Sequence, residues 1–458
     1  MHFPFSFWKS SGPTPQAMYF TDMGSGLWAD SANWFDDSGY ITPAGRTPIS
    51  GDEVWMGSQF TDNAPSLTLV SYNGTGPAAA SQTQNLHVSG GIYMSAGVWG
   101  GSNDNGAVGY FSGTAEMASS STYGTEFTGN CGFHDSSLNS GYISVGGYFY
   151  DTSASTGNIN TAYFSDYSVN SGTVNDGGTF YQYSTNSSSG VVSATIGTIS
   201  FHDGSVNYGT CNDVNVDFYD NAQNGSSGAC GYSATFHDWT TNYASYLGMG
   251  TFYDYAGDFG STYSGYYNGN SSTQGGNITS YAYFNDSAVN NSENYYDAQF
   301  TGTSYNLGVC DLTASFYGYS YNDGTVHDVA AFYDSASNAS AGVVNDNFSA
   351  SHNLFSGSSL NYGIAYYHTD MTDYSINYAF AGQGNFSGHA ENASGAHANI
   401  MAYFIDDSVN NGTTNADADF DGNAVNNGYV TGLAQFFGNS SNYGTYGTIS
   451  CSTTGTCP

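Results

Sequence analysis

The sequence predicts an all-β fold, a β-solenoid with capping segments at both ends, on three observations. Phe recurs at intervals of about sixteen residues from Phe111 to Phe436 of the 458-residue chain. Fixed positions around each Phe hold a small residue, Asp or Gly, Asn, Gly and Val. Gly, Asn, Ser and β-forming residues dominate, whereas long runs of the helix formers Ala, Leu, Glu and Lys are missing. The repeat predicts about twenty coils.

The repeat is clearest in three segments, AYFSDYSVNSGTV from Ala162, AYFNDSAVNNSEN from Ala282 and AYFIDDSVNNGTT from Ala402. The small residue and the Phe lie two apart, so both face the same side of a strand. The Asp or Gly two residues after the Phe predicts a tight turn, because both tolerate the left-handed backbone region. A later Gly-x-Val starts a second short strand. The gap from Phe348 to Phe386 is predicted to hold an insertion.

Equivalent positions of successive coils are expected to stack about 4.8 Å apart, the spacing of hydrogen-bonded strands. The Phe side chains then form one continuous narrow core. The predicted core stack includes Phe164, Phe180, Phe284, Phe300, Phe316, Phe332, Phe404 and Phe420.

Asn recurs six residues after the Phe. A buried Asn is costly unless its polar groups are bonded. When stacked at every coil, each side-chain amide can donate to the oxygen of the next, in a ladder that also holds the register. The alternative is a turn Asn that faces solvent, and recurrence at a single phase favours the ladder. The predicted ladder includes Asn139, Asn170, Asn186, Asn207, Asn290, Asn306, Asn322, Asn410 and Asn426.

The chain is strongly acidic and almost free of basic residues. Its formal net charge is −35, and its basic residues are Lys9 and Arg46. Nucleic acids and anionic membrane surfaces are excluded as partners, because the counter-charge is missing. No apolar run reaches the roughly 18 residues that a membrane-spanning helix needs. Residues 1–17 lack the charged region and long apolar core of a secretory signal, so a signal lies outside this sequence or export uses another route.

The first ninety residues follow the repeat poorly and contain GLWADSANWFDDSGYITPAGRTPISGDEVWM from Gly26 to Met56. This segment resembles the start of secreted bacterial β-solenoid surface proteins, both autotransporter-like and adhesin-like chains. The shared elements are G-x-W (Gly26, Trp28), N-W (Asn33, Trp34), Pro48 and G-D-x-V (Gly51, Asp52, Val54). The resemblance implies a solenoid start, export and an extracellular or cell-surface location, and it carries no catalytic residues.

We therefore expect three segments: a cap and irregular β segment at 1–90, the repeat array at 91–448, and a Cys-containing cap at 449–458. At the first end, Trp28, Trp34 and Trp55 would plug the open core, because solenoids need capped ends.

Two pairs of Cys are disulfide candidates. Five residues separate Cys451 and Cys457, a spacing that closes a small hairpin, so we expect a disulfide or a capping loop. Cys211 and Cys230 take the Val position in successive coils. Their Cα atoms are therefore expected about 5 Å apart, within disulfide range. The alternative is a pair of inert core thiols.

Asp in the turn position of four consecutive coils predicts a row formed by Asp203, Asp220, Asp238 and Asp254. Like charges about 5 Å apart repel by about 1 kcal/mol in water. Bound Ca²⁺ would remove that cost and prefers oxygen ligands. The alternative is an exposed row with diffuse counter-ions. No EF-hand loop occurs, and Ca²⁺ is the only cofactor the sequence suggests.

The recurring residues are those that build a coil, so we do not expect an enzyme. No HExxH or GxSxG motif occurs, and the basic residues that pectate lyase-like β-helices need are missing. The leading hypothesis is a structural subunit of an extracellular filament or surface layer that self-assembles end to end or laterally. The alternative is an adhesin or phage-fibre-like module whose surface Tyr residues bind cell-surface glycans. A polysaccharide-active β-helix enzyme is third.

Overall fold

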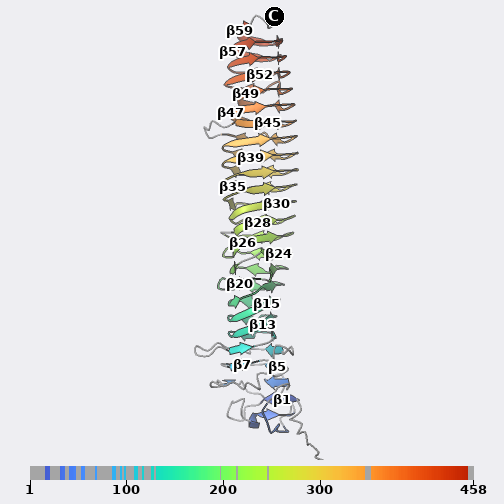
Figure 1. Cartoon of the computed structure of the whole chain (residues 1–458), viewed down its shortest axis with the longest axis vertical. Coiled ribbons are helices and arrows are strands. Elements are labelled where there is room, and N and C mark those ends of the chain that lie inside the picture. The colour runs from blue at the N-terminus through green and yellow to red at the C-terminus, as the bar shows by residue number, and fades with distance from the viewer. Residues whose placement is uncertain are drawn as a thin grey trace, which may run out of the picture. The chain divides into compact units, whose positions relative to one another are not determined.

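The computed structural model describes residues 130–451 apart from 196, 213–214, 245–246 and 346–351. Before residue 130 it describes 16–20, 31–36, 41–47 and the strand segments from 53–56 to 125–127. The chain is an all-β solenoid of parallel stacked coils of about 16 residues, with about 19 turns against the roughly twenty predicted. It divides into two compact units, unit 1 (Met1–Val216) and unit 2 (Asp217–Pro458). Within each unit, Figure 1 shows short strands stacked coil upon coil.

Unit 1 stacks its coils in register. Its regular part contains β13 (Tyr142–Phe149), β14 (Ala154–Ser155), β15 (Asn158–Phe164) and β16 (Val169–Asn170). The pairing of β13 with β15 is parallel and sets Phe149 beside Phe164. The pairing of β14 with β16 is parallel and sets Ser155 beside Asn170. Equivalent residues of successive coils therefore lie side by side, as the repeat predicts.

Unit 2 has three short β segments in a typical coil, one more than predicted, because the Asn lies in a two-residue strand of its own. One coil consists of β33 (Ala282–Phe284), β34 (Val289–Asn290) and β35 (Glu293–Asn294). The next consists of β36 (Ala298–Phe300), β37 (Tyr305–Asn306) and β38 (Val309–Cys310), and β39 (Thr313–Phe316) follows. All these strands pair in parallel with their counterparts sixteen residues on.

The Phe side chains form the core of each unit. Every member of the predicted stack is fully buried. In unit 2, Phe284, Phe300, Phe316 and Phe332 stack with ring centroids 4.7–4.8 Å apart and nearly parallel planes. This separation is the distance between hydrogen-bonded strands, so the backbone pairing and the ring stacking support one another.

The prediction that the gap from Phe348 to Phe386 holds an insertion is wrong. The gap from Phe332 to Phe386 holds two coils whose core positions are taken by Phe355 and Met371, both fully buried. Phe355 stacks on Phe332 at 4.5 Å. The parallel pairing of β47 (Ile364–Met371) with β49 (Phe380–Phe386) sets Met371 beside Phe386. Met fills the Phe position because it is long, apolar and adaptable. Phe348, which the spacing of the repeat predicts as a core Phe, lies outside the described residues.

The Asp-or-Gly position has the backbone conformation that its composition predicts. Asp151 and Asp166 have φ of 58° and 61°, and Gly302 and Gly318 both have φ of 70°. Residues with a side chain, apart from Asp and Asn, rarely adopt this left-handed backbone conformation, whereas Gly adopts it without steric cost.

The start of unit 1 pairs strands within the segment predicted as a cap. β1 (Ala17–Phe20) lies antiparallel to β2 (Trp34–Phe35) and parallel to β3 (Glu53–Met56). β3 pairs in parallel with β5 (Asn85–Val88), which pairs with β8 (Val108–Phe111). Trp34 is fully buried, as a core plug requires. The other motif and plug positions, Gly26, Trp28, Pro48, Gly51, Asp52 and the side chains of Val54 and Trp55, lie outside the described residues.

Candidate functional site

The predicted Asn ladder is confirmed. In unit 2, from Asn290 onward, each ladder Asn Nδ2 donates to the Oδ1 of the ladder Asn in the next coil at 2.7–2.9 Å. All are buried, so the alternative of solvent-facing turn residues is wrong. The ladder runs through Asn290, Asn306, Asn322, Asn338, Asn361, Asn377, Asn392, Asn410, Asn426 and Asn442.

The ladder in unit 1 follows the same rule. Asn170 donates to Asn186, and Asn186 donates to Asn207, both at 2.8 Å. Asn139 donates to Ser155 Oγ at 3.1 Å, because Ser replaces Asn in that coil. The Oδ1 atoms also accept backbone N–H groups two residues on, as from Gly209 to Asn207 at 3.2 Å. Each buried amide is thus bonded both along the coil stack and within its own turn.

A buried carboxylate interrupts the ladder in unit 2. Asp258 takes the Asn position and is 1% exposed. Its Oδ1 accepts Asn242 Nδ2 at 2.8 Å and the Gly260 N–H at 3.1 Å. Its Oδ2 accepts Thr262 Oγ1 at 2.7 Å and the Tyr267 hydroxyl at 2.8 Å. Four donors therefore surround one carboxylate inside the coil.

Tyr267 occupies the core position that Phe takes elsewhere, and it is fully buried between Phe252 and Phe284 at 4.8 Å from each. Burial raises the pKa of Asp258, although the hydrogen bonds to its carboxylate oppose that rise. Burial and the neighbouring carboxylate raise the pKa of Tyr267 well above its ordinary value. The sequence signal for this network is two departures from the repeat nine residues apart, Asp for Asn and Tyr for Phe.

The predicted Ca²⁺ site at Asp203, Asp220, Asp238 and Asp254 finds no support in the geometry of the described residues and stays a prediction. All four side chains are exposed, and each residue has a left-handed backbone with φ between 51° and 57°. Within the described part of the chain, no group of three or more His, Cys, Asp or Glu side chains can hold a metal ion. The turns present one carboxylate per coil, whereas Ca²⁺ takes six to eight oxygen ligands converging on one point.

Some turn carboxylates accept hydrogen bonds from the neighbouring coil. Asp373 Oδ2 accepts Ser356 Oγ at 2.8 Å and the Gly357 N–H at 3.2 Å. These bonds lower the pKa of Asp373. Asp151 Oδ2 likewise accepts the Asp135 N–H of the preceding coil at 3.1 Å. Such a carboxylate connects neighbouring turns through hydrogen bonds.

Cys131, Cys230 and Cys310 are buried and form no disulfide in the structure, which favours the core-thiol alternative for Cys230. Cys211 is fully buried too. The side chain of Cys451 and all of Cys457 lie outside the described residues, so the C-terminal disulfide stays a prediction.

Two adjoining hollows lie on the outward face of unit 2. The first has a volume of about 320 Å³. Its lining comes from β26 (Ala229–Phe236), β28 (Leu247–Phe252), β30 (Thr262–Tyr267) and the segment at β33. The lining residues are Gly231, Tyr232, Gly248, Met249, Tyr263, Ser264, Tyr266, Tyr281 and Tyr283.

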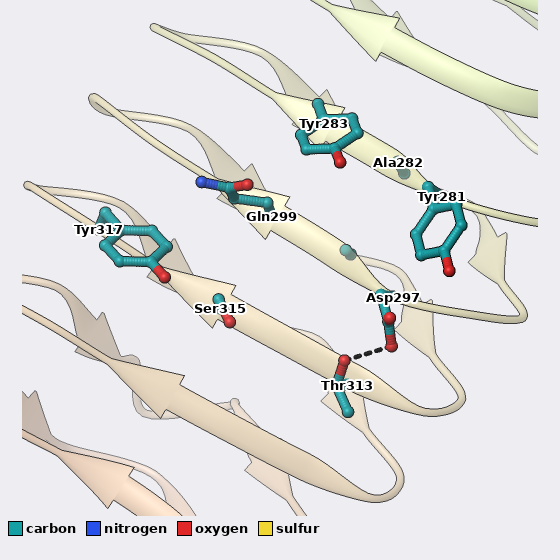
Figure 2. A pocket seen from close by; sticks show the side chains of 9 residues that line it. Tyr281, Ala282, Tyr283, Asp297, Gln299, Thr313, Ser315 and Tyr317 are labelled. Carbon is teal, nitrogen blue, oxygen red and sulfur yellow. Dashed lines mark hydrogen bonds between the residues drawn. The ribbon is translucent and has the colours of Figure 1, made fainter.

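The second hollow, about 220 Å³, continues across β33, β36 and β39 (Figure 2). It shares Tyr281 and Tyr283 with the first. Figure 2 shows Tyr283, Gln299 and Ser315 in one row across three coils, and Tyr281, Asp297 and Thr313 in a second row. Thr313 Oγ1 donates to Asp297 Oδ1. We call the two hollows together the tyrosine groove.

The parallel stacked coils and the Asn ladder together define the chain as a β-solenoid repeat protein. Comparisons with protein-family models, with curated proteins and with solved structures find no match. Among the described residues, no helix is long and apolar enough to cross a membrane.

Proposed function

We propose that the chain is a structural subunit of an extracellular filament or cell-surface layer, and that neighbouring copies assemble through their coils. The observation that supports this is the constancy of the junction between coils. From Asn290 to Asn442, the same amide-to-amide hydrogen bond recurs at 2.7–2.9 Å at each step. A junction that repeats so closely within one copy can also form between two copies.

The chemistry of a coil edge favours this assembly. The edge of a parallel β coil presents backbone N–H and C=O groups that can pair with another strand. Stacking the first coil of one copy on the last coil of another joins two different surfaces. Head-to-tail contacts of this kind produce open filaments when the rotation does not close a ring.

The charge sets the conditions for assembly. Each copy has a formal charge of −35, so copies repel one another at low ionic strength. Salt shortens the screening length from about 30 Å at 0.01 M to about 3 Å at 1 M. Assembly should therefore increase with salt.

Negative-stain electron microscopy and analytical ultracentrifugation test the proposal. The purified chain should form ordered polymers whose amount rises with protein concentration and with NaCl. Parallel samples with CaCl₂ at equal ionic strength separate screening from specific Ca²⁺ binding, and we expect the two salts to act alike. A chain that stays monomeric at high concentration, in NaCl and in CaCl₂, would exclude the proposed function.

A further inference from the structure

The tyrosine groove is continuous, because Tyr281 and Tyr283 line both of its hollows. It crosses the strands from β26 to β39, and Tyr317, just after β39, is its last lining residue. Consecutive coils lie about 4.8 Å apart, so the groove extends along the stack rather than along one strand. A ligand that fills it is therefore elongated and contacts several coils in turn.

Three aromatic side chains of the groove are more than half exposed. Tyr232 is 70% exposed, Tyr263 54% and Tyr281 53%. Tyr266 stacks on Tyr283 at 4.8 Å with nearly parallel rings, which fixes the orientation of that pair. Exposed aromatic rings gathered in a hollow are a typical feature of a binding surface.

Polar groups lie between the rings. Ser264, Asp297, Gln299 and Ser315 all line the groove. Their hydroxyl, carboxylate and amide groups can accept or donate hydrogen bonds. Sugars have the matching chemistry, because a pyranose ring has an apolar C–H face for an aromatic ring and hydroxyl groups around its edge.

The charge of the molecule narrows the class of sugar. The chain has two Lys and Arg residues, Lys9 and Arg46, and the described residues that line the groove include no Lys or Arg. An anionic ligand would meet a carboxylate at Asp297 and no counter-charge, so uronic acid and sulfated polymers are disfavoured. A cationic ligand would meet one carboxylate in the groove, Asp297, which already accepts a hydrogen bond from Thr313. Cationic ligands are therefore disfavoured as well.

We propose that the tyrosine groove binds a neutral polysaccharide, which lies across the coils with its sugar rings against Tyr232, Tyr263 and Tyr281. Gly248 lines the first hollow where the backbones of β26 and β28 approach closely. A Cβ at Gly248 would lie 2.3 Å from the Tyr232 carbonyl oxygen, so a side chain there would need the backbone to shift. The site does not depend on contacts between copies and is separate from the proposed assembly.

Isothermal titration calorimetry of the full chain tests the site. The ligands are the neutral hexasaccharides cellohexaose, maltohexaose, mannohexaose and xylohexaose, with hexagalacturonate as the anionic comparator. At least one neutral ligand should bind, and hexagalacturonate should not. Tyr281→Ala should weaken binding about tenfold through the lost ring contact, and Tyr281→Phe should retain most of it.

Tyr319→Ala is the matched control, since Tyr319 is 73% exposed in unit 2 and lines neither hollow. Its affinity should be unchanged, and circular dichroism should show that all three variants fold. The proposal is overturned if no neutral ligand binds, if hexagalacturonate binds equally well, or if Tyr281→Ala and Tyr319→Ala behave alike. Polymerisation lost in Tyr281→Ala, with no sugar bound by the parent chain, would assign the groove to contacts between copies instead.

Discussion

Replacing one ladder residue tests how strongly the buried amides hold the coils together. Asn306 lies in the middle of the unit 2 ladder and is fully buried. Its Oδ1 accepts Asn290 Nδ2 at 2.8 Å, and its Nδ2 donates to Asn322 Oδ1 at 2.7 Å. The substitution Asn306→Ala removes both bonds and leaves a buried donor on one neighbour and a buried acceptor on the other.

The expected cost follows from these two orphaned groups. A buried polar group without a partner costs about 1–3 kcal/mol, so the two together predict a loss of about 2–6 kcal/mol in the free energy of unfolding. Asn306→Thr should fall between the parent chain and Asn306→Ala. The hydroxyl of Thr273 already donates to a ladder amide, Asn290 Oδ1, at 2.9 Å, and a Thr at position 306 could do the same.

Urea denaturation measures the loss, and hydrogen exchange of the backbone amides in β34, β37 and β40 (Tyr321–Asn322) locates it. Exchange is needed because stacked repeats can unfold in parts. The matched control is Asn427→Ala. Asn427 is exposed and donates to Asn411 of the preceding coil at 2.9 Å, so the same bond is lost in water, at an expected cost within about 0.5 kcal/mol. Equal losses for the two Ala variants would refute the reasoning.

Four further predictions follow from buried and exposed polar groups. Asp258→Asn should raise the urea midpoint at pH 7. Because burial raises the folded-state pKa of Asp258 above 3.8, the folded state binds that proton more tightly, and stability falls as the pH rises from 3.8 through the folded pKa. The Asn variant should lack this fall, and an unchanged pH profile would count against it. Tyr267→Phe should lower the free energy of unfolding at pH 7 by about 1–3 kcal/mol, because the carboxylate loses a donor. In the double variant with Asp258→Asn most of that loss should vanish, whereas additive effects would argue against coupling. Cys310 should resist iodoacetamide until the chain unfolds, since burial raises the pKa of its thiol, and mass spectrometry of native and urea-treated protein checks this. EDTA should leave the urea midpoint unchanged, because no described group of side chains can hold a metal ion, and a drop reversed by Ca²⁺ would instead support the predicted Ca²⁺ site.

The sequence predicted the fold because the features that define a coil recur at every coil. The Phe stack, the left-handed Asp or Gly and the ladder Asn each serve the contact of one coil with the next, so each recurs at one phase. The ladder could be placed residue by residue for the same reason, from Asn139 to Asn426. The short strand around each Asn was missed, since a two-residue strand has no periodicity of its own.

The network of Asp258 and Tyr267 could not be predicted from the repeat, because two repeated residues are replaced together, Asn by Asp and Phe by Tyr. Asp258 would be an unpaired buried charge in a coil of standard sequence, and charges of that kind are strongly disfavoured. It is tolerated because Thr262 and Tyr267, both in β30, supply hydrogen-bond donors to its carboxylate. The Ca²⁺ prediction rests on the row of Asp alone and stays a prediction. Among the described residues, no group of three or more His, Cys, Asp or Glu side chains can hold a metal ion.

The tyrosine groove could not be predicted, because outward positions need not repeat to keep the coil intact. In successive coils, one outward row holds Tyr266, Tyr283, Gln299 and Ser315. A solenoid core constrains only the inward half of each strand, so a function added to such a scaffold should appear as a local departure from uniformity on the outside. Tyr281 and its neighbours are such a departure, in a molecule whose inward positions are nearly invariant. Surface residues that break the repeat in several adjoining coils are therefore the ones to test first for binding.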